Sequence, residues 1–561
     1  MTATVDSAPT ASPIQGLWRR QLDRYPDTRP RMTYLAIVVL ATIILYYQFY
    51  IPAAVATSII AHFGMTFDTY VYIIVIANAV GAFGSLAAGL ADRWGRANLV
   101  AYGLVITGLL ILFGVPNATN TATYAVLFAA VGVVEGIILV ATPALVRDFS
   151  PQLGRASAMG FWTLGPVVGS LVVAIVSSNT LSHLTAWQDQ FIICGIVGLV
   201  VAAIAVVGLR ELSPQLRDQL MVSMRDRALI EAKARGLQVE GLLKRPWRQM
   251  VRWDIIGSAF AISVFLLVYY TAVGFFPVYF ETLHGFSLST ANSIGDWFWA
   301  FDAGALIVIG IISDRVGVRK PFMVVGAVGA IAMTIVFLNL GVGTTYTTFA
   351  VVISILAVFL AIGFAPWMAS YTETVEKHNP ALTATGLAVW GWILRAVVAI
   401  AFLIMPTVVS SMTPLVTYGS TVSTLSAKYG QQLATGLAID PATQATLAAN
   451  PLNGAADAKA VGEIAAAFHI SPAAATARFT ALATVPSADL LYLHAHAADV
   501  QTAASQASGQ WKDWWWVCVG GEVLFIPLIL LMTGRWSPRR AREDAEEHER
   551  RVQEELTALG S

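Results

Sequence analysis

Long apolar segments separated by short polar stretches recur along almost the whole chain. A helix needs about 20 consecutive apolar residues to cross the hydrocarbon core of a bilayer. The pattern therefore predicts an all-α membrane protein with twelve transmembrane helices. Their predicted ranges are 32–56, 70–91, 97–117, 122–146, 156–178, 189–210, 254–280, 289–313, 320–342, 347–371, 382–408 and 513–534.

Lysine and arginine residues are distributed asymmetrically between the connections. If the first helix starts in the cytoplasm, 29 of the 34 fall in cytoplasmic segments, 4 in outer segments and one, Arg395, within a helix. Lys and Arg accumulate on the cytoplasmic side of membrane proteins. We therefore expect a multi-pass protein of the cell (plasma) membrane with both termini in the cytoplasm.

The composition narrows the class of protein further. Of the 561 residues, 57% are hydrophobic and 12% are charged, which is typical of a chain that has the lipid bilayer as a partner. The net charge is zero, so nothing indicates binding to nucleic acid. The sequence contains no nucleotide-binding loop and no set of nucleophile, base and orienting group. We therefore expect neither an enzyme nor an ATP-driven pump, and no cofactor or metal.

The chain repeats itself, with one interruption. Asp92 and Asp314 lie in similar loops 222 residues apart, whereas Ser213 and Ser537, each followed by proline, lie 324 residues apart. The excess of about 100 residues indicates an insertion between the eleventh and twelfth helices. The predicted parts are a disordered cytoplasmic tail (1–31), a six-helix bundle (32–210), a cytoplasmic central loop (211–253), helices seven to eleven (254–408), an extracytoplasmic helical insertion (409–512), helix twelve (513–534) and a charged cytoplasmic C-terminal helix (535–561).

The insertion is rich in alanine and polar residues. Its helices are predicted to start at Asp440-Pro441 and Ser471-Pro472, where a capping side chain precedes proline at the first helical position. Three interpretations remain open: a decoration without its own function, a lid over the outer mouth, and a docking surface for an unidentified partner.

Two polar loops carry the same motif. Residues 88–96 read A-G-L-A-D-R-W-G-R, and residues 310–320 read G-I-I-S-D-R-V-G-V-R-K. Each follows the second helix of its half and joins it to the third. This pattern resembles the signature loop of the major facilitator superfamily, a class of secondary transporters. The resemblance implies two six-helix halves around a central cavity that opens alternately to either side of the membrane.

The resemblance also implies that the two loops act as gating latches. An aspartate at the end of helix two faces the start of helix eleven, where the helix dipole stabilises a negative charge, and the aspartate of the second loop faces helix five in the same way. The candidate gating residues are Asp92, Arg93, Gly95 and Arg96 in the first loop and Asp314, Arg315, Gly317 and Arg319 in the second.

Three ionisable residues are predicted near the middle of the membrane. Glu135 and Asp302 each lie 12 residues before the cytoplasmic end of their helix, which is roughly 18 Å at 1.5 Å per residue. Arg395 lies at a similar depth. Charged residues at this depth are functional candidates, because they are costly to place there. Either Arg395 attracts an anionic group while Asp302 or Glu135 takes up and releases a proton, or Asp302 and Arg395 form a structural salt bridge.

Polar and aromatic residues at comparable depth are candidate contacts of a substrate. Rings with polar atoms suit such contacts, although core packing explains many of them. The pair Tyr46-Tyr47 recurs 223 residues later as Tyr269-Tyr270, which supports their assignment to the cavity. The predicted substrate-binding residues are Arg395, Tyr46, Tyr47, Gln48, Tyr269, Tyr270, Trp299 and Trp392.

The direction of transport is not indicated consistently. Gly165-Pro166 and Gly169 resemble an element of proton antiporters that export drugs, but helix four carries Gly132 where those exporters have arginine. Three hypotheses follow: a proton symporter for a small anionic metabolite, a proton-linked exporter of hydrophobic or cationic compounds, and a non-transporting sensor or partner-binding protein that acts through the insertion. The arginine within a helix favours the first.

Overall fold

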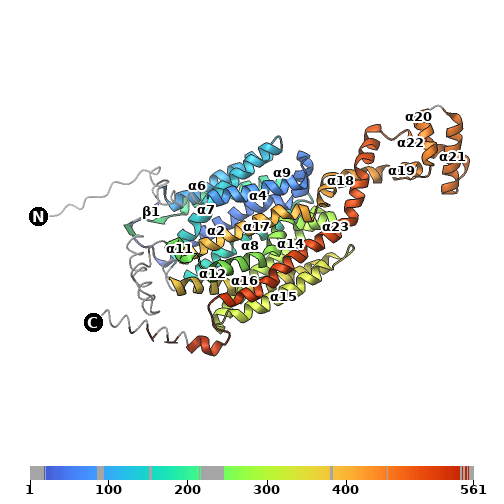
Figure 1. Cartoon of the computed structure of the whole chain (residues 1–561). Coiled ribbons are helices and arrows are strands. Elements are labelled where there is room, and N and C mark those ends of the chain that lie inside the picture. The colour runs from blue at the N-terminus through green and yellow to red at the C-terminus, as the bar shows by residue number, and fades with distance from the viewer. Residues whose placement is uncertain are drawn as a thin grey trace. The chain divides into compact units, whose positions relative to one another are not determined.

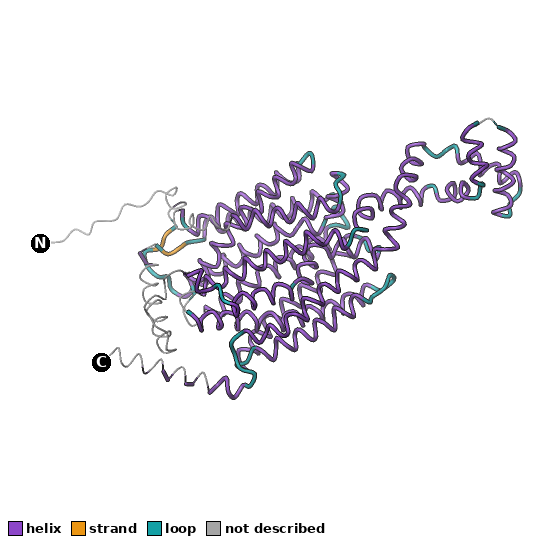
Figure 2. The backbone as a smooth tube through the Cα atoms, in the orientation of Figure 1, coloured by secondary structure: helices purple, strands orange, loops and turns teal. Residues whose placement is uncertain are grey.

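We describe the protein from a computed structural model. The structure describes residues 18, 20–84, 94–150, 155–213, 215–216, 246–379, 383–450, 453–543, 546–547, 550–551 and 554. The chain forms two compact units, Met1–Val408 with Trp511–Ser561, and Val409–Gln510. Figures 1 and 2 show that helices make up nearly all of the described backbone.

The described residues contain twelve helices that are long and apolar enough to cross a membrane, as predicted. Those of the first half are α2 (Thr28–Ala54), α4 (Phe67–Gly84), α6 (Arg96–Leu109, continued by η2, Leu110–Gly114, and η3, Val115–Asn117), α7 (Thr121–Phe149), α8 (Arg155–Thr180) and α9 (Trp187–Gly208). Those of the second half are α12 (Trp253–Phe265) with α13 (Leu267–His284), α14 (Leu288–Val316), α15 (Lys320–Leu338), α16 (Tyr346–His378), α17 (Thr383–Val408) and α23 (Ser487–Leu528, continued by η6, Ile529–Leu531).

These spans lie side by side in the first unit (Figure 1). The short helices α3 (Ala56–Phe63) and α11 (Pro246–Met250) precede α4 and α12. We call the end of this unit at which α2 begins its inner end, and the opposite end its outer end, after the predicted orientation. The two halves repeat the same packing: α4 contacts α7 as α14 contacts α16, and α2 contacts α8 as α12 contacts α17.

Glycines allow α4 and α7 to touch through their backbones. A Cβ atom at Gly136 would overlap the carbonyl oxygen of Gly81, and one at Gly132 would overlap that of Ala77. Small residues spaced four apart permit such close approach of helices in membranes. The contact also explains why Gly132 is not an arginine, since any side chain there would strike α4.

A two-stranded parallel sheet ties the chain before α2 to the chain after α9. Strand β1 (Gln21–Leu22) pairs with β2 (Glu211–Leu212), and the amide of Glu211 donates to the carbonyl of Arg20 over 3.0 Å. Arg20 is fully buried, and its Nη1 donates to the carbonyl of Ala205 over 3.0 Å in the last turn of α9. A cation at a helix C-terminus satisfies carbonyls that lack helical partners and complements the helix dipole.

We expect Arg20→Ala to lower the stability of the first unit. The variant leaves buried carbonyls of α9 without this donor, which costs about 2 kcal/mol. The apparent melting temperature of the purified protein should fall, whereas the surface variant Arg539→Ala should melt like the wild type, since Arg539 is exposed. Equal melting of both variants would contradict a stabilising role for the buried guanidinium.

The second unit is a small helical bundle. Its helices are α18 (Met412–Lys428), α19 (Gly430–Leu437), α20 (Pro441–Ala449), α21 (Gly454–Phe468), α22 (Pro472–Leu482) and the first part of α23. The predicted helix starts are confirmed, because Asp440 caps α20 and Ser471 caps α22. Its core contains Ile439, Ala460, Ile464 and Ala475.

Candidate substrate site

Two tyrosines of α2 face the helices of the second half. Tyr46 and Tyr50 lie one helical turn apart, with ring centroids separated by 5.4 Å. They can approach α8 because that helix carries glycine opposite them: a Cβ atom at Gly169 would lie 2.6 Å from the Cβ of Tyr46, and one at Gly165 would lie 2.6 Å from the methyl group of Thr42. The Gly-Pro element of α8 therefore has a packing role that positions Tyr46.

Arg395 of α17 lies close enough to Glu135 of α7 for the two charges to interact. It also interacts electrostatically with Tyr46 of α2 and Tyr270 of α13. Glu135 is 5% exposed, and Arg395 is partly buried. Four helices from both halves thus bring a cation, a carboxyl group and two phenols into one region.

Asp302 of α14 is the second buried carboxyl group predicted for the site. Its side chain is 3% exposed, and it interacts electrostatically with Tyr269 of α13. The Tyr269 ring contacts both Tyr270, at 5.2 Å between centroids, and Trp299, at 5.1 Å. Of these two carboxyl groups, only Glu135 interacts electrostatically with Arg395, whereas the sequence left open a structural salt bridge between Arg395 and Asp302.

Two of the predicted contact residues, Tyr47 and Gln48, point toward α9. Tyr47 is fully buried and interacts with Cys194 of α9, and the side chain of Gln48 lies against Gly198 of the same helix. Trp392 is 46% exposed on α17. Adjacent helical residues point in different directions, so Tyr47 and Gln48 cannot share the face of Tyr46. The structure places them between α2 and α9.

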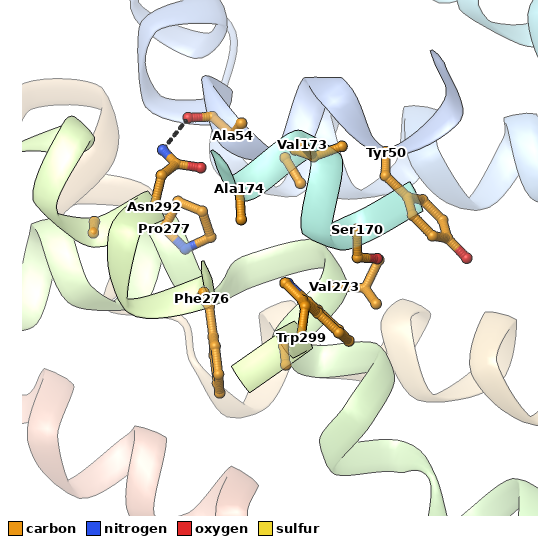
Figure 3. A pocket seen from close by; sticks show the side chains of 14 residues that line it. Tyr50, Ala54, Ser170, Val173, Ala174, Val273, Phe276, Pro277, Asn292 and Trp299 are labelled. Atoms are coloured by element: carbon orange, nitrogen blue, oxygen red, sulfur yellow. Dashed lines mark hydrogen bonds between the residues drawn. The ribbon is translucent and has the colours of Figure 1, made fainter. Parts of the chain in front are cut away.

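We call Tyr46, Tyr50, Tyr269 and Tyr270 the tyrosine group. A pocket lined by Tyr50 adjoins this group on its outer side (Figure 3). It lies between α2, α8, α13 and α14, and both Tyr50 and Trp299 line it. Ser170 and Asn292 also line it, and neither is among the contact residues predicted from the sequence. Ser170 directly follows Gly169 in the element that we interpreted only through its glycine and proline. The position of that element at mid-helix was the signal that could have identified Ser170.

Hydrogen bonds join the two halves at the outer end. They run from Thr57 Oγ1 to Glu281 Oε2 (2.6 Å), from Ser178 Oγ to Asp296 Oδ2 (2.9 Å) and from Asn292 Nδ2 to the carbonyl of Ala54 (2.9 Å). The Phe67 and Phe275 rings also meet across the halves, at 5.8 Å between centroids. These contacts close the outer end above the tyrosine group.

The first signature loop is described in part. Asp92 and Arg93 lie outside the described residues. Gly95 has a φ of +88°, and a Cβ atom there would overlap the Glu211 side chain. Glu211 Oε2 accepts from the backbone amide of Arg96 over 2.7 Å, and the guanidinium of Arg96 contacts both carboxylate oxygens of Asp148 at 2.8 and 2.9 Å. The loop is thus fixed to its own half by two carboxylates.

In the second loop, Arg319 is the central residue. It pairs with Asp314 at 2.7 Å and with Glu373 at 3.3 Å. Gly317 ends α14 with a φ of +75°, and Arg315 is exposed. The Asp314 side chain is 70% exposed. We predicted that Asp314 would face helix five, whereas here it pairs within its own loop.

Comparisons with known proteins agree with this architecture. Residues 38–402 match the family model of the Major Facilitator Superfamily. Among solved structures, a bacterial homologue of the human lysosomal transporter Spinster, in an inward-facing conformation, superposes with a TM-score of 0.58 at 17% identity, covering 91% of this chain and 100% of that one. A D-xylose-proton symporter superposes with a TM-score of 0.51 at 13% identity, covering 67% and 89%. At sequence identities this low, the structural similarity shows only that the chains share a fold.

Curated relatives are transporters with different names. The probable anion transporter 3, chloroplastic, of Arabidopsis thaliana is 26% identical over 298 residues, which are 50% of this chain and 55% of that protein. An MFS-type efflux pump of Mycolicibacterium smegmatis is 26% identical over 309 residues, 52% and 65% of the two chains. The chain therefore spans about half the length of the curated relatives it matches. The fold, the repeated packing and the family model together show that this chain belongs to the major facilitator superfamily.

Proposed function

We propose that the protein is a proton-coupled symporter that moves a small organic anion across the plasma membrane by alternating access. The observation that carries the proposal is the approach of Arg395 and Glu135 from opposite halves, surrounded by tyrosines. A guanidinium binds carboxylates strongly and with defined geometry, so Arg395 is the anchor for an anionic substrate.

Glu135 couples the anion to a proton in this proposal. An ionised Glu135 and an anionic substrate compete for Arg395. A proton on Glu135 removes this competition, so that the anion and the proton bind together. Asp302 is a second candidate for proton uptake, because it is a buried carboxyl group in the same layer. Tyr46, Tyr270 and Trp299 would complete the contacts to the substrate.

Alternating access requires the outer end to open. The hydrogen bonds of Thr57 with Glu281 and of Ser178 with Asp296 join the halves there, and they would break as the halves separate. The two signature loops are proposed to close the inner end in the opposite state, in which Asp92 and Asp314 face the other half. The extracytoplasmic insertion is proposed to stand outside this cycle.

A relative named as an efflux pump favours export as the second candidate function. The Gly-Pro element of α8 does not strengthen it, because Gly165 and Gly169 pack against α2. A cationic drug would also meet the positive charge of Arg395. We therefore rank symport of an anion first.

A thermal-shift screen of the purified protein tests the choice. Ligand binding stabilises the folded state by about 2.7 kcal/mol when the ligand exceeds its Kd a hundred-fold. We expect an organic anion to raise the melting temperature of the wild type, and of the surface control Arg539→Ala, but not of Arg395→Ala. A shift caused only by cationic drugs, and equal in Arg395→Ala, would instead favour export.

A further inference from the structure

Two lysines at the inner end of the second half lie close to each other. Lys320 is the first residue of α15, and Lys377 lies in the last turn of α16. Their ammonium groups are near enough to interact electrostatically. Among the residues that the structure describes, neither lysine pairs with a carboxylate. Like charges at close range repel, so this pair favours an anion that comes from outside the chain.

Lys320 is deeply buried for a cation. It is 7% exposed, and its Nζ lies over the Trp536 ring at 5.8 Å from the ring centroid. The face of an aromatic ring attracts a cation but carries no charge that could neutralise it. Buried charges in proteins are normally paired. The contact with Trp536 therefore orients the ammonium group and leaves its charge to an anion.

The chain after η6 positions Trp536. The carbonyl of Thr533 accepts from Ser370 Oγ over 3.0 Å, and the amide of Thr533 donates to Thr374 Oγ1 over 3.0 Å, which fixes this residue on α16. Gly534 follows with a φ of +110°, a conformation that glycine adopts readily. Three separate segments of the second half thus surround the Lys320 ammonium group.

The start of α15 contributes backbone donors to the same place. Its N-cap residue, Arg319, makes no side-chain bond to the amides of the first turn. The Arg319 guanidinium pairs instead with Asp314 and Glu373. The first amides of a helix lack helical partners and carry a partial positive charge, and phosphate groups bind there in many proteins. Buried Lys320 adds a full positive charge at this helix end.

The surroundings of the two lysines resemble the border of a bilayer. Trp536 is 49% exposed, as is typical of tryptophans at the level of the lipid headgroups. Farther outward, α15 exposes Val325 and Val328, and η6, which packs against α15, exposes Leu530. A phosphate that carries acyl chains therefore finds exposed apolar side chains on both elements.

We propose that this end of the second half binds the phosphate group of an anionic phospholipid. Lys320 and Lys377 hold the phosphate oxygens, the first turn of α15 donates its backbone amides, and the acyl chains lie along α15 and η6. Basic sites between helices on the cytoplasmic side suit anionic headgroups. The site contains none of the proposed substrate-binding residues, so its test does not depend on the transported substrate.

Melting of the purified full-length protein in an uncharged detergent tests the proposal. The probes are dioctanoyl phosphatidylglycerol, dioctanoyl phosphatidylcholine and inorganic phosphate. A bound ligand raises the melting temperature, and the dependence on its concentration gives an apparent Kd. We expect phosphatidylglycerol to bind about ten-fold more tightly than phosphatidylcholine, because the choline cation offsets the charge of the phosphate. Inorganic phosphate at the same concentration should cause no shift, because it has no acyl chains.

Two variants remove one positive charge each. Lys320→Met keeps an apolar stem in the buried position, and Lys377→Gln changes an exposed side chain. Each should weaken phosphatidylglycerol about five-fold. Arg248→Gln is the matched control, because Arg248 is an exposed cation on α11, and it should bind like the wild type.

Equal binding of phosphatidylglycerol and phosphatidylcholine to the wild type would overturn the proposal. So would unchanged phosphatidylglycerol binding in both lysine variants. An equal shift with inorganic phosphate would show that the site takes a free phosphate, and a lipid ligand would then be wrong. If Lys320→Met does not fold, Lys377→Gln decides the question, because its exposed position tolerates replacement.

Discussion

Glu135→Gln is expected to abolish proton-driven accumulation of the anion while preserving exchange of the anion across the membrane. Glutamine has the shape and hydrogen-bonding groups of a protonated glutamate but never ionises. Arg395 then stays available to the substrate in every state, and the cavity carries the anion without moving a proton. In proteoliposomes, an imposed pH gradient should no longer concentrate the anion, whereas counterflow should continue at a rate similar to that of the wild type.

Glu522→Gln is the matched control for this experiment. Glu522 is also a fully buried carboxyl group within a span, but it lies on α23, where its Oε1 accepts from Thr334 Oγ1 over 2.8 Å. Its replacement should leave accumulation intact. If Glu135→Gln still accumulates the anion against its gradient, Glu135 is not the coupling group, and Asp302→Asn becomes the decisive variant.

Gly136→Val is expected to prevent formation of a stable first half. A Cβ atom at Gly136 overlaps the backbone of Gly81, so that α4 and α7 must separate along their whole contact. Overpacking of a tight core typically costs about 1–3 kcal/mol, and here the cost should be larger because the obstacle is backbone that cannot move aside. The yield of monodisperse protein in size-exclusion chromatography should fall to near background.

Gly304→Val controls for the introduction of a β-branched residue into a span. Gly304 lies in α14, and a Cβ atom built there meets no described atom within 4 Å apart from its chain neighbours and the nearby backbone of its own helix. This variant should be produced and should melt like the wild type. Normal production of Gly136→Val would mean that α4 and α7 lie farther apart than described.

The fold was largely predictable because its signals are local. Segment length and apolar content identify a span without any knowledge of its neighbours. The same holds for the second unit, where Asp440 and Ser471 each start a helix through bonds to amides within three residues. The similarity between the loops around Asp92 and Asp314 was equally visible, since it is found by comparing the chain with itself.

The candidate site was predictable only in part, because it depends on how helices rotate and meet. The depth of Glu135, Asp302 and Arg395 follows from counting residues, but the partner of Arg395 follows from packing. Sequence proximity suggested that Tyr46 and Tyr47 act together. In the structure the Tyr46 ring contacts the Tyr50 ring, since residues four apart share a helix face and adjacent residues do not.

The strand pair β1 and β2 has a consequence for the order in which the protein is made. Leu22 precedes the first span, and Leu212 follows the sixth, so their pairing needs all six spans of the first half to be in place. Strands β1 and β2 can therefore pair while the ribosome is still producing the second half. Once Arg20 binds the carbonyl of Ala205 at the end of α9, the two ends of the first half are held together. This half can then stay folded in the membrane until the second half is inserted.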